Sequence, residues 1–402
     1  METLPNELRR AILARLPLRD LKHIRQTSKS WGLLGQEYLI VPDFRTLPHR
    51  PDTLHLKGIS SHPAYAPCIQ SIHFNHGEVN EYSGRHNSYF LQYLMVPEER
   101  LTQQHVTWDA YAYFKQLTDK FLPSSCDEDT LTDIFSRLPN LTSLKISLML
   151  CPFIKWSPHV PDLLANIWIF PSTRLLPRVA TVERMTSIMN AVAANSATLS
   201  IDTLSHDRLP FEFFFQNQNK MAVISSAFKN LTSLTLFMDY SDLPNNTHSD
   251  TAFSNLVKCL RAAPLLQALS LAFQGRRKVD IAPLLSSFAA DGYTFQHLST
   301  LQFQGMTMTE DDLVDFLVRH KATLAHITIG GAGVRAVRQP PTEANGCAIF
   351  LEGDLKGLES GEVWVFERPV AAEEAVASKK FDELPDGEMA DVEDAQDASW
   401  PV

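Results

Sequence analysis

The sequence predicts an α/β chain in three parts: a short three-helix module, a body of stacked strand–helix units, and an acidic, disordered C-terminal tail. Three observations lead to this fold class. The first forty residues carry short apolar stripes at helical spacing. A leucine pattern then recurs at intervals long enough for one strand and one helix. Residues 367–402 are acidic and poor in apolar side chains, as in segments that do not fold.

The N-terminal module is predicted to contain three short helices. Pro5 is expected at the first position of the first helix, where its missing N–H costs nothing. Pro17 ends that helix, because the residue before a proline is pushed out of the helical region, and a second helix starts near Leu18. A break at 28–30 precedes a third. So short a bundle cannot bury a self-sufficient core, and its surplus of apolar residues predicts a partner surface.

The same residues carry a family resemblance. The string formed by 4–8, Ile12, 16–21 and 28–31 resembles the F-box, with Thr27 where the family often has valine. In that family the motif binds a Skp-type adaptor, which links to a cullin scaffold and a RING ubiquitin ligase. A helical hairpin that only caps the body is the alternative. The resemblance implies that the adaptor contacts are Leu4, Pro5, Leu8, Ile12, Leu16, Leu18, Leu21 and Trp31.

The body shows a repeated pattern: an apolar residue, two others, an apolar residue, one other, and an apolar residue. Clear copies start at Leu141, Leu231, Leu266, Leu298 and Leu324, the last four being 35, 32 and 26 residues apart. A weaker copy starts at Ile69, and 199–204 reads as an irregular strand. The period is near that of leucine-rich repeats stretched by longer helices. An irregular leucine-rich-repeat-like solenoid is therefore predicted, with a leucine-rich α/β fold without repeats as the alternative.

Residues that alternate with the inward apolar pair point out of the strands, because successive side chains of a strand face opposite sides. These outward residues are mostly small and polar, and we expect them to bind a protein substrate whose identity the sequence does not specify. The expected contact residues are Ser143, Lys145, Ser233, Thr235, Ser270, Thr300, Gln302, His326 and Thr328.

These patterns divide the chain into five segments. The expected division is an F-box at 1–44, a linker and first irregular repeat at 45–130, the substrate-binding body at 131–335, closing strands at 336–366, and the tail at 367–402. A proline-rich stretch at 154–177 is expected to project as an inserted loop. The order of F-box, an Ile59–Pro63 helix, an aromatic-rich helix and LPNLTSL resembles a fungal class of F-box proteins with degenerate repeats, to about Gly333.

Charge and cysteine content exclude several classes of protein. Residues 367–402 hold eleven acids and three bases, so they carry −8 of the net charge of −10 and leave −2 on the rest. A nearly neutral body argues against nucleic-acid binding. The five cysteines form no CxxC pair, which favours free thiols in a reducing compartment. The N-terminus lacks the bases of a signal peptide, and no apolar run approaches the ~18 residues of a membrane span. We expect a cytoplasmic or nuclear protein without membrane contact.

The sequence contains no complete catalytic or metal-binding pattern. His73 and His76 lie three residues apart without further ligands nearby, and the glycines at 330–333 lack the lysine and spacing of a phosphate loop. We therefore expect no metal, no cofactor and no catalysis. The interpretation is a non-catalytic substrate-recognition subunit of a Skp–cullin–F-box ubiquitin ligase. Two alternatives stay open: a Skp-binding scaffold without a role in ubiquitination, and an α/β enzyme with an unrecognised site.

Overall fold

The computed structural model describes residues 4–38, 42–77, 112–150, 178–240, 249–274, 278–330, 333–335 and 363–367. The main sheet contains β1 (Asp43–Thr46), β2 (Ser71–Asn75), β3 (Ser143–Ser147), β4 (Thr203–Pro210), β5 (Ser233–Asp239), β6 (Ala268–Gln274), β8 (Thr300–Gln304), β10 (His326–Gly330) and β12 (Val363–Glu367). A small second sheet contains β7 (Val279–Asp280), β9 (Met306–Thr309) and β11 (Gly333–Arg335).

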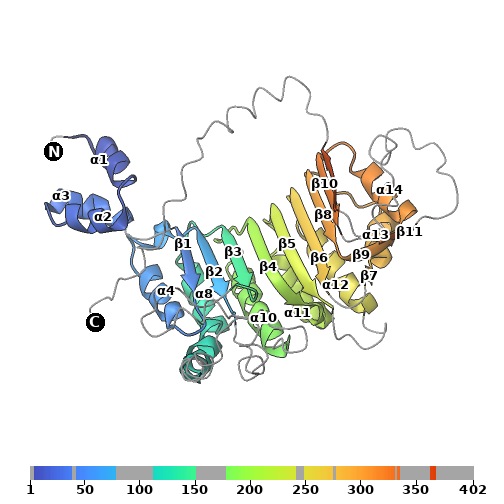
Figure 1. Ribbon diagram of the computed structural model, residues 1–402, viewed down its shortest axis with the longest axis horizontal. Helices are drawn as coiled ribbons and strands as arrows, with labels where there is room; N and C mark the ends of the chain where they lie inside the picture. Colours follow the sequence, from blue (N-terminus) through green and yellow to red (C-terminus); the bar gives the residue numbers. More distant parts are fainter. Residues whose placement is uncertain are drawn as a thin grey trace, which may run out of the picture.

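The helices precede, connect and flank these strands (Figure 1). The N-terminal module contains α1 (Asn6–Leu13), α2 (Leu18–Ile24), α3 (Lys29–Leu34) and the 3-10 helix η1 (Gly35–Tyr38). The body contains α4 (Asp52–Ser60), η2 (Ala66–Cys68), a helix that includes 112–125, α8 (Glu128–Ser136), α10 (Arg178–Ala194), η4 (Phe211–Phe215), α11 (Gln218–Ser226), α12 (Ser249–Arg261), α13 (Ala282–Ala290) and α14 (Glu310–Arg319). No helix in the described ranges is both long and apolar enough to cross a membrane.

The main sheet is built in chain order. From β1 to β10 each strand pairs in parallel with the next strand of the sheet, and β12 closes the end antiparallel to β10 (Figure 1). Parallel neighbours need a crossover connection, and helices supply it along one side of the sheet (Figure 1). The mixed α/β class with an N-terminal helical module is thus confirmed, with a parallel sheet as its body.

The core lies between the sheet and these helices. The register aligns one apolar residue from each of the parallel strands, β1 to β10, in a continuous row: Phe44, Ile72, Leu144, Leu204, Leu234, Leu269, Leu301 and Ile327. Apart from the partly buried Phe44, all are buried and belong to one cluster with helix residues such as Leu256 and Phe316. Burial of the whole row requires neighbouring units, because no single strand–helix pair covers its own apolar face.

Strand β4 fills the long interval that the leucine pattern left between Leu141 and Leu231. Its unit starts at Ile201 and continues through Leu204, but the third apolar position is His206. The register places His206 between Ile146 of β3 and Leu236 of β5, in an otherwise apolar row. A bulge between His206 and Leu209 follows directly. The histidine explains why this unit was predicted only as an irregular strand.

The turn between β8 and β9 depends on a glycine. Gly305 has φ +71°, and a Cβ at this position would lie 2.1 Å from the carbonyl oxygen of Phe273. Only glycine tolerates both the left-handed backbone and this close approach. The turn lets the chain leave the main sheet at Gln304 and begin the second sheet at Met306.

The N-terminal module has a small core of its own. Leu13, Leu21 and Trp31 form a buried cluster, with Leu16, Ile24, Leu34 and Tyr38 packed against it. This cluster is separate from the core of the body. Prolines precede the first two helices as N-caps, and the Ser28 hydroxyl accepts a hydrogen bond from the Trp31 N–H at 3.3 Å. Helix α1 ends at Leu13, before the predicted end near Pro17.

Several expectations fall on residues outside the described ranges. They concern the inserted loop at 154–177, the first of the closing strands, and the tail beyond Glu367. The second expected closing strand corresponds to β12. The aromatic-rich stretch is helical over 112–125.

Truncating a residue of the buried row should destabilise the body strongly. Leu269→Ala removes a buried side chain and leaves a cavity, so the free energy of unfolding should fall by about 2–5 kcal/mol. Thr235→Ala, on the opposite and half-exposed face, should change it by less than about 0.5 kcal/mol. Urea denaturation followed by circular dichroism measures both. Equal effects would contradict the observed register.

Candidate functional site

The first candidate surface is the outside of the N-terminal module. Leu8 and Ile12 lie four residues apart on α1, so they share one face of the helix, and they are 53% and 37% exposed. Leu33 on α3 is 68% exposed. Large apolar side chains that are exposed on so small a module form a surface suited to docking a partner. Leu13 is the α1 residue that enters the core.

The eight residues expected to contact an adaptor therefore separate into groups. Leu8, Ile12 and Pro5 are exposed, while Leu4 and Leu16 are half-buried. Leu21 and Trp31 are only 4% and 2% exposed, and their role is to hold the three helices together. Their contact with an adaptor stays a prediction. The side chain of Leu18 lies outside the description, although its backbone opens α2.

Arg9 fixes the first and third helices of the module to each other. Its Nε donates to the Leu4 carbonyl at 2.7 Å, and its guanidinium also donates to the Ser30 hydroxyl. The same guanidinium lies 5.9 Å from the centre of the Trp31 ring. These contacts hold α1 against α3, so the exposed leucine and isoleucine are presented on a defined frame.

The second candidate surface is the face of the main sheet opposite the core. The register gathers the nine residues expected there into two adjacent rows. One row contains Ser143, Ser233, Thr300 and His326, and the other contains Lys145, Thr235, Ser270, Gln302 and Thr328. They are half-buried or exposed, and the Ser270 hydroxyl donates to the side-chain amide oxygen (Oε1) of Gln302 at 3.2 Å. Arg45, His73 and Ser205 continue the second row but were missed, because β1 has no leucine copy and the pattern in β2 and β4 is weak.

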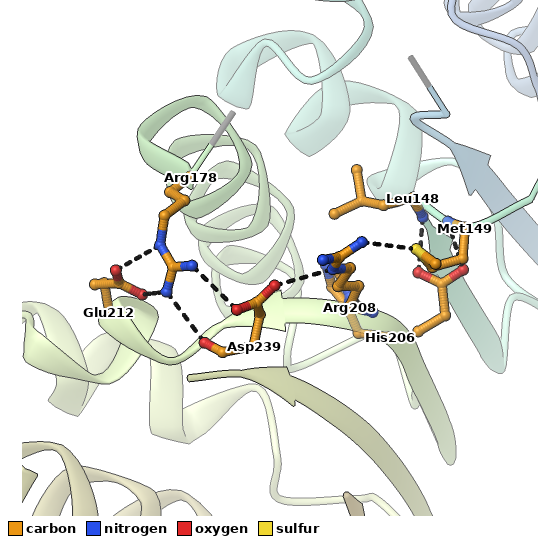
Figure 2. A network of polar contacts seen from close by, with 8 residues as sticks. Leu148, Met149, Arg178, His206, Arg208, Glu212 and Asp239 are labelled. Atoms are coloured by element: carbon orange, nitrogen blue, oxygen red, sulfur yellow. Dashed lines mark hydrogen bonds and ion pairs between the residues drawn. The ribbon is translucent and has the colours of Figure 1, made fainter. Parts of the chain in front are cut away.

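An ionic network lies where β4 and β5 end (Figure 2). Asp239 is fully buried and accepts hydrogen bonds from Arg178 Nη1 at 3.1 Å and from Arg208 Nε at 3.0 Å. Arg178 also forms a two-pronged pair with Glu212 at 2.6 and 2.7 Å. Two cations thus share two carboxylates, which satisfies a charge that would be costly to bury alone.

Asp207 connects β4 to the end of β3 through hydrogen bonds. Its carboxylate accepts hydrogen bonds from the backbone N–H groups of Leu148 and Met149 at 2.7 and 2.9 Å, and from the Ser147 hydroxyl. Burial raises the pKa of Asp207, and these bonds oppose that rise. Arg208 Nη1 donates to the Met149 sulfur at 3.2 Å (Figure 2). The two chain ends that flank 151–177 are therefore fixed: Leu148 and Met149 by Asp207, and Arg178 by Glu212 and Asp239.

A buried histidine and a buried cysteine, His76 and Cys126, form a second polar contact inside the body. The sulfur of Cys126 lies 3.3 Å from His76 Nε2, and both side chains are buried. Burial raises the pKa of Cys126 to about 11 and lowers that of His76 well below its usual value. A neutral thiol beside a neutral imidazole is a structural hydrogen bond, since nucleophilic chemistry requires the thiolate. No three His, Cys, Asp or Glu residues converge as metal ligands within the described part of the chain.

A groove of about 770 Å³ lies on the helical side of the body. Its lining combines residues of α8, α10, η4 and α11: Glu128, Arg178, Val179, Val182, Glu183, Thr186, Ser187, Asn190, Glu212, Gln216 and Lys220. The Arg178–Glu212 pair forms part of its wall. This lining contains neither histidine nor cysteine, so the groove offers no nucleophile–base arrangement of that kind.

A family model matches the N-terminal module, which carries the first candidate surface. Residues 1–34 match the family model described as the F-box domain. F-box domains bind Skp-type adaptors in cullin-RING ligases. A comparison with curated proteins found no match. The chain thus carries an F-box domain at its N-terminus, and the family match does not extend into the sheet.

Removing the central carboxylate of the ionic network should be costly. Asp239→Asn removes the buried carboxylate that Arg178 and Arg208 share, so the free energy of unfolding should fall by about 3–5 kcal/mol. Asp119→Asn breaks an exposed pair with Lys115 and should cost less than about 1 kcal/mol. Urea denaturation of the two variants compares them directly. A similar small loss for both would show that the network contributes little.

His206 should make stability depend on pH. Its Nδ1 accepts the Arg208 N–H at 3.0 Å, its Nε2 has no hydrogen-bond partner among the described residues, and burial lowers its pKa from 6.5 to about 3. Protons therefore prefer the unfolded chain. The contribution of His206 is complete above pH 6.5 and is lost as the pH falls from 6.5 towards 3.

Between pH 7.5 and pH 5 this loss should amount to about 2 kcal/mol. His206→Leu should reduce the pH dependence of the free energy of unfolding, measured by urea denaturation, by that amount. The exposed His297→Gln should leave it unchanged. Parallel pH profiles for His206→Leu and the unmodified chain would contradict a neutral buried imidazole.

Proposed function

We propose that this chain is the substrate-recognition adaptor of a Skp–cullin–F-box ubiquitin ligase, acting without catalysis of its own. The observation that carries the proposal is the F-box match over 1–34 together with the exposed Leu8 and Ile12 on a module that keeps its own core. The module docks on the Skp-type adaptor. The body holds a protein substrate on the outer face of its sheet, and works in the cytoplasm or the nucleus.

The proposed body is a leucine-rich-repeat-like solenoid. Its strands follow one another in chain order, their apolar row is continuous, and a backbone hydrogen bond joins the residue before each strand to its counterpart in the next unit from Gln70 to Ala325. Stacked units of this kind create an extended surface on the side free of helices. The half-exposed hydroxyl and amide groups of that surface suit hydrogen bonding with an extended segment of a partner.

The proposed mechanism is proximity. A substrate held on the sheet is tethered to the ligase through the F-box, which raises the effective concentration of its lysines near the charged conjugating enzyme. No reacting group of the chain is required. The separate cores of module and body support this division of labour, since each half can keep its binding surface without sharing side chains with the other.

A scaffold that binds the Skp-type adaptor without ubiquitination is the second candidate. Co-purification separates the two. The adaptor role requires cullin to accompany the Skp-type adaptor when the full chain is isolated from cells, and Skp-type adaptor without cullin would favour the scaffold.

The α1 surface should dominate binding to the Skp-type adaptor. Leu8→Ala combined with Ile12→Ala removes two apolar contacts, each worth about 1.5–3 kcal/mol when buried, and should weaken binding at least tenfold. The melting temperature should be unchanged, because both side chains are exposed in the free chain. Surface plasmon resonance with the purified adaptor gives the affinities.

The matched control is Leu54→Ala, which truncates an equally exposed leucine on α4 of the body and should bind normally. Trp31→Ala should also lose binding, but together with the folding of the module, which circular dichroism of the full chain at increasing temperature reports. Full affinity after the Leu8/Ile12 double change would refute the proposed docking surface.

A further inference from the structure

In one row of the outer face, which runs from β1 to β10, the charged side chains lie at the β1–β3 end. Arg45 of β1, His73 of β2 and Lys145 of β3 occupy equivalent positions in the register, so they form three consecutive members of one row. Arg45 and Lys145 are exposed, and His73 is half-buried between them. The row continues through five uncharged polar residues on the remaining parallel strands: Ser205, Thr235, Ser270, Gln302 and Thr328.

The two cations of this row, Arg45 and Lys145, have no ion-pair partner in the part of the chain that the structure describes. Burial, together with the charges of Arg45 and Lys145, lowers the pKa of His73 to about 4, while Asp43 acts in the opposite direction to a smaller extent. The histidine is thus neutral at pH 7, and the net field at this end of the face is positive despite Asp43.

The spacing of the two cations sets what can reach both. Strands in a sheet lie about 4.8 Å apart, so positions on β1 and β3 are separated by roughly 10 Å. A segment in the extended polyproline II conformation advances roughly 3.1 Å per residue with three residues per turn, so two acidic residues three positions apart point to the same side, roughly 9 Å from each other, and would match the two cations. Beyond them, the hydroxyl and amide groups of the row would meet an uncharged polar continuation of the same segment.

We propose that the Arg45–Lys145 end of the outer face binds an extended acidic segment of the partner protein, whose carboxylates pair with these two side chains. The inference rests on the proposed function, because it names the class of substrate segment that the sheet would hold. Carboxylate is the chemistry chosen, since Arg45 presents a planar fork and Lys145 a point charge, and both are exposed without an ion pair to any described residue.

The test uses the purified full chain and two fluorescein-labelled peptides. One consists of five Glu-Ser-Ser units, which place carboxylates three residues apart, and the other of five Gln-Ser-Ser units. Fluorescence anisotropy at 50 mM salt should show at least tenfold tighter binding of the glutamate peptide. The preference should shrink at 500 mM salt, because exposed charge pairs are screened. Equal binding of the two peptides, or no binding of either, would overturn the proposal.

Charge reversal locates the site. Arg45→Glu with Lys145→Glu should weaken binding of the glutamate peptide at least tenfold. Lys220→Glu with Lys258→Glu changes the net charge equally on the helices α11 and α12, and should alter the affinity by less than twofold. Equal losses in both double variants would reduce the effect to overall charge, and a loss confined to the second would place the site on the helical side. Either result overturns the assignment.

Two further measurements complete the design. A synthetic peptide of residues 382–397 should compete no better than the glutamate peptide, and much tighter competition would assign the row to the chain's own C-terminal segment instead. Binding of the Skp-type adaptor is measured on the same preparations. Normal adaptor binding with no peptide preference would contradict only the inference of an acidic segment. Absence of adaptor binding by the unmodified chain would contradict the proposed function.

Discussion

The stacking of parallel strands in register is the constraint on which the rest of this molecule depends. Side chains of a strand alternate between two faces, so a shift by one residue would exchange the buried and exposed sets. In this sheet the row through Leu144, Leu234 and Leu301 stays on the helical side from β1 to β10. The same register therefore produces both the hydrophobic core and the polar outer face. A functional surface on the sheet needs no separate device to assemble it.

The register is disturbed at β4, and the polar groups of the interior gather there. His206 stands in an apolar row, a bulge follows it, and Asp207 and Arg208 then turn towards β3 and β5. Asp207 fixes the backbone after β3, and Arg208 shares Asp239 with Arg178 at the start of α10 (Figure 2). A local loss of apolar packing is thus offset by hydrogen bonds and ion pairs. The arrangement anchors Leu148 and Met149 before residues 151–177 and Arg178 after them.

The sequence predicted the elements whose signal is local. Proline and serine positions located the three N-terminal helices, and leucine spacing located β3, β5, β6, β8 and β10. It also placed nine outer-face residues on the correct strands, because alternation within a strand needs no knowledge of its neighbours. Pairing between distant strands was beyond it. The row that joins Arg45 to His73 and Lys145 exists only through the register of three strands, and the Arg178–Asp239 contact spans sixty-one residues.

Burial was the other quantity that spacing alone could not supply. Leu8 and Ile12 recur at helical spacing on α1, yet both side chains are exposed to solvent. Leu13, which does not share their face of the helix, enters the core instead. In a module with so few helices, the larger apolar face is free because the body builds its own core elsewhere. The chain passes from η1 to β1 within five residues, which puts the basic end of the sheet next to the module (Figure 1). Under the proposed function, an acidic segment bound there is held at the end of the sheet nearest the ligase, and the short link restricts the volume that its lysines explore. Proximity is then a consequence of where in the chain order the charged strands occur, since the same row on β8 and β10 would hold its partner at the far end of the sheet.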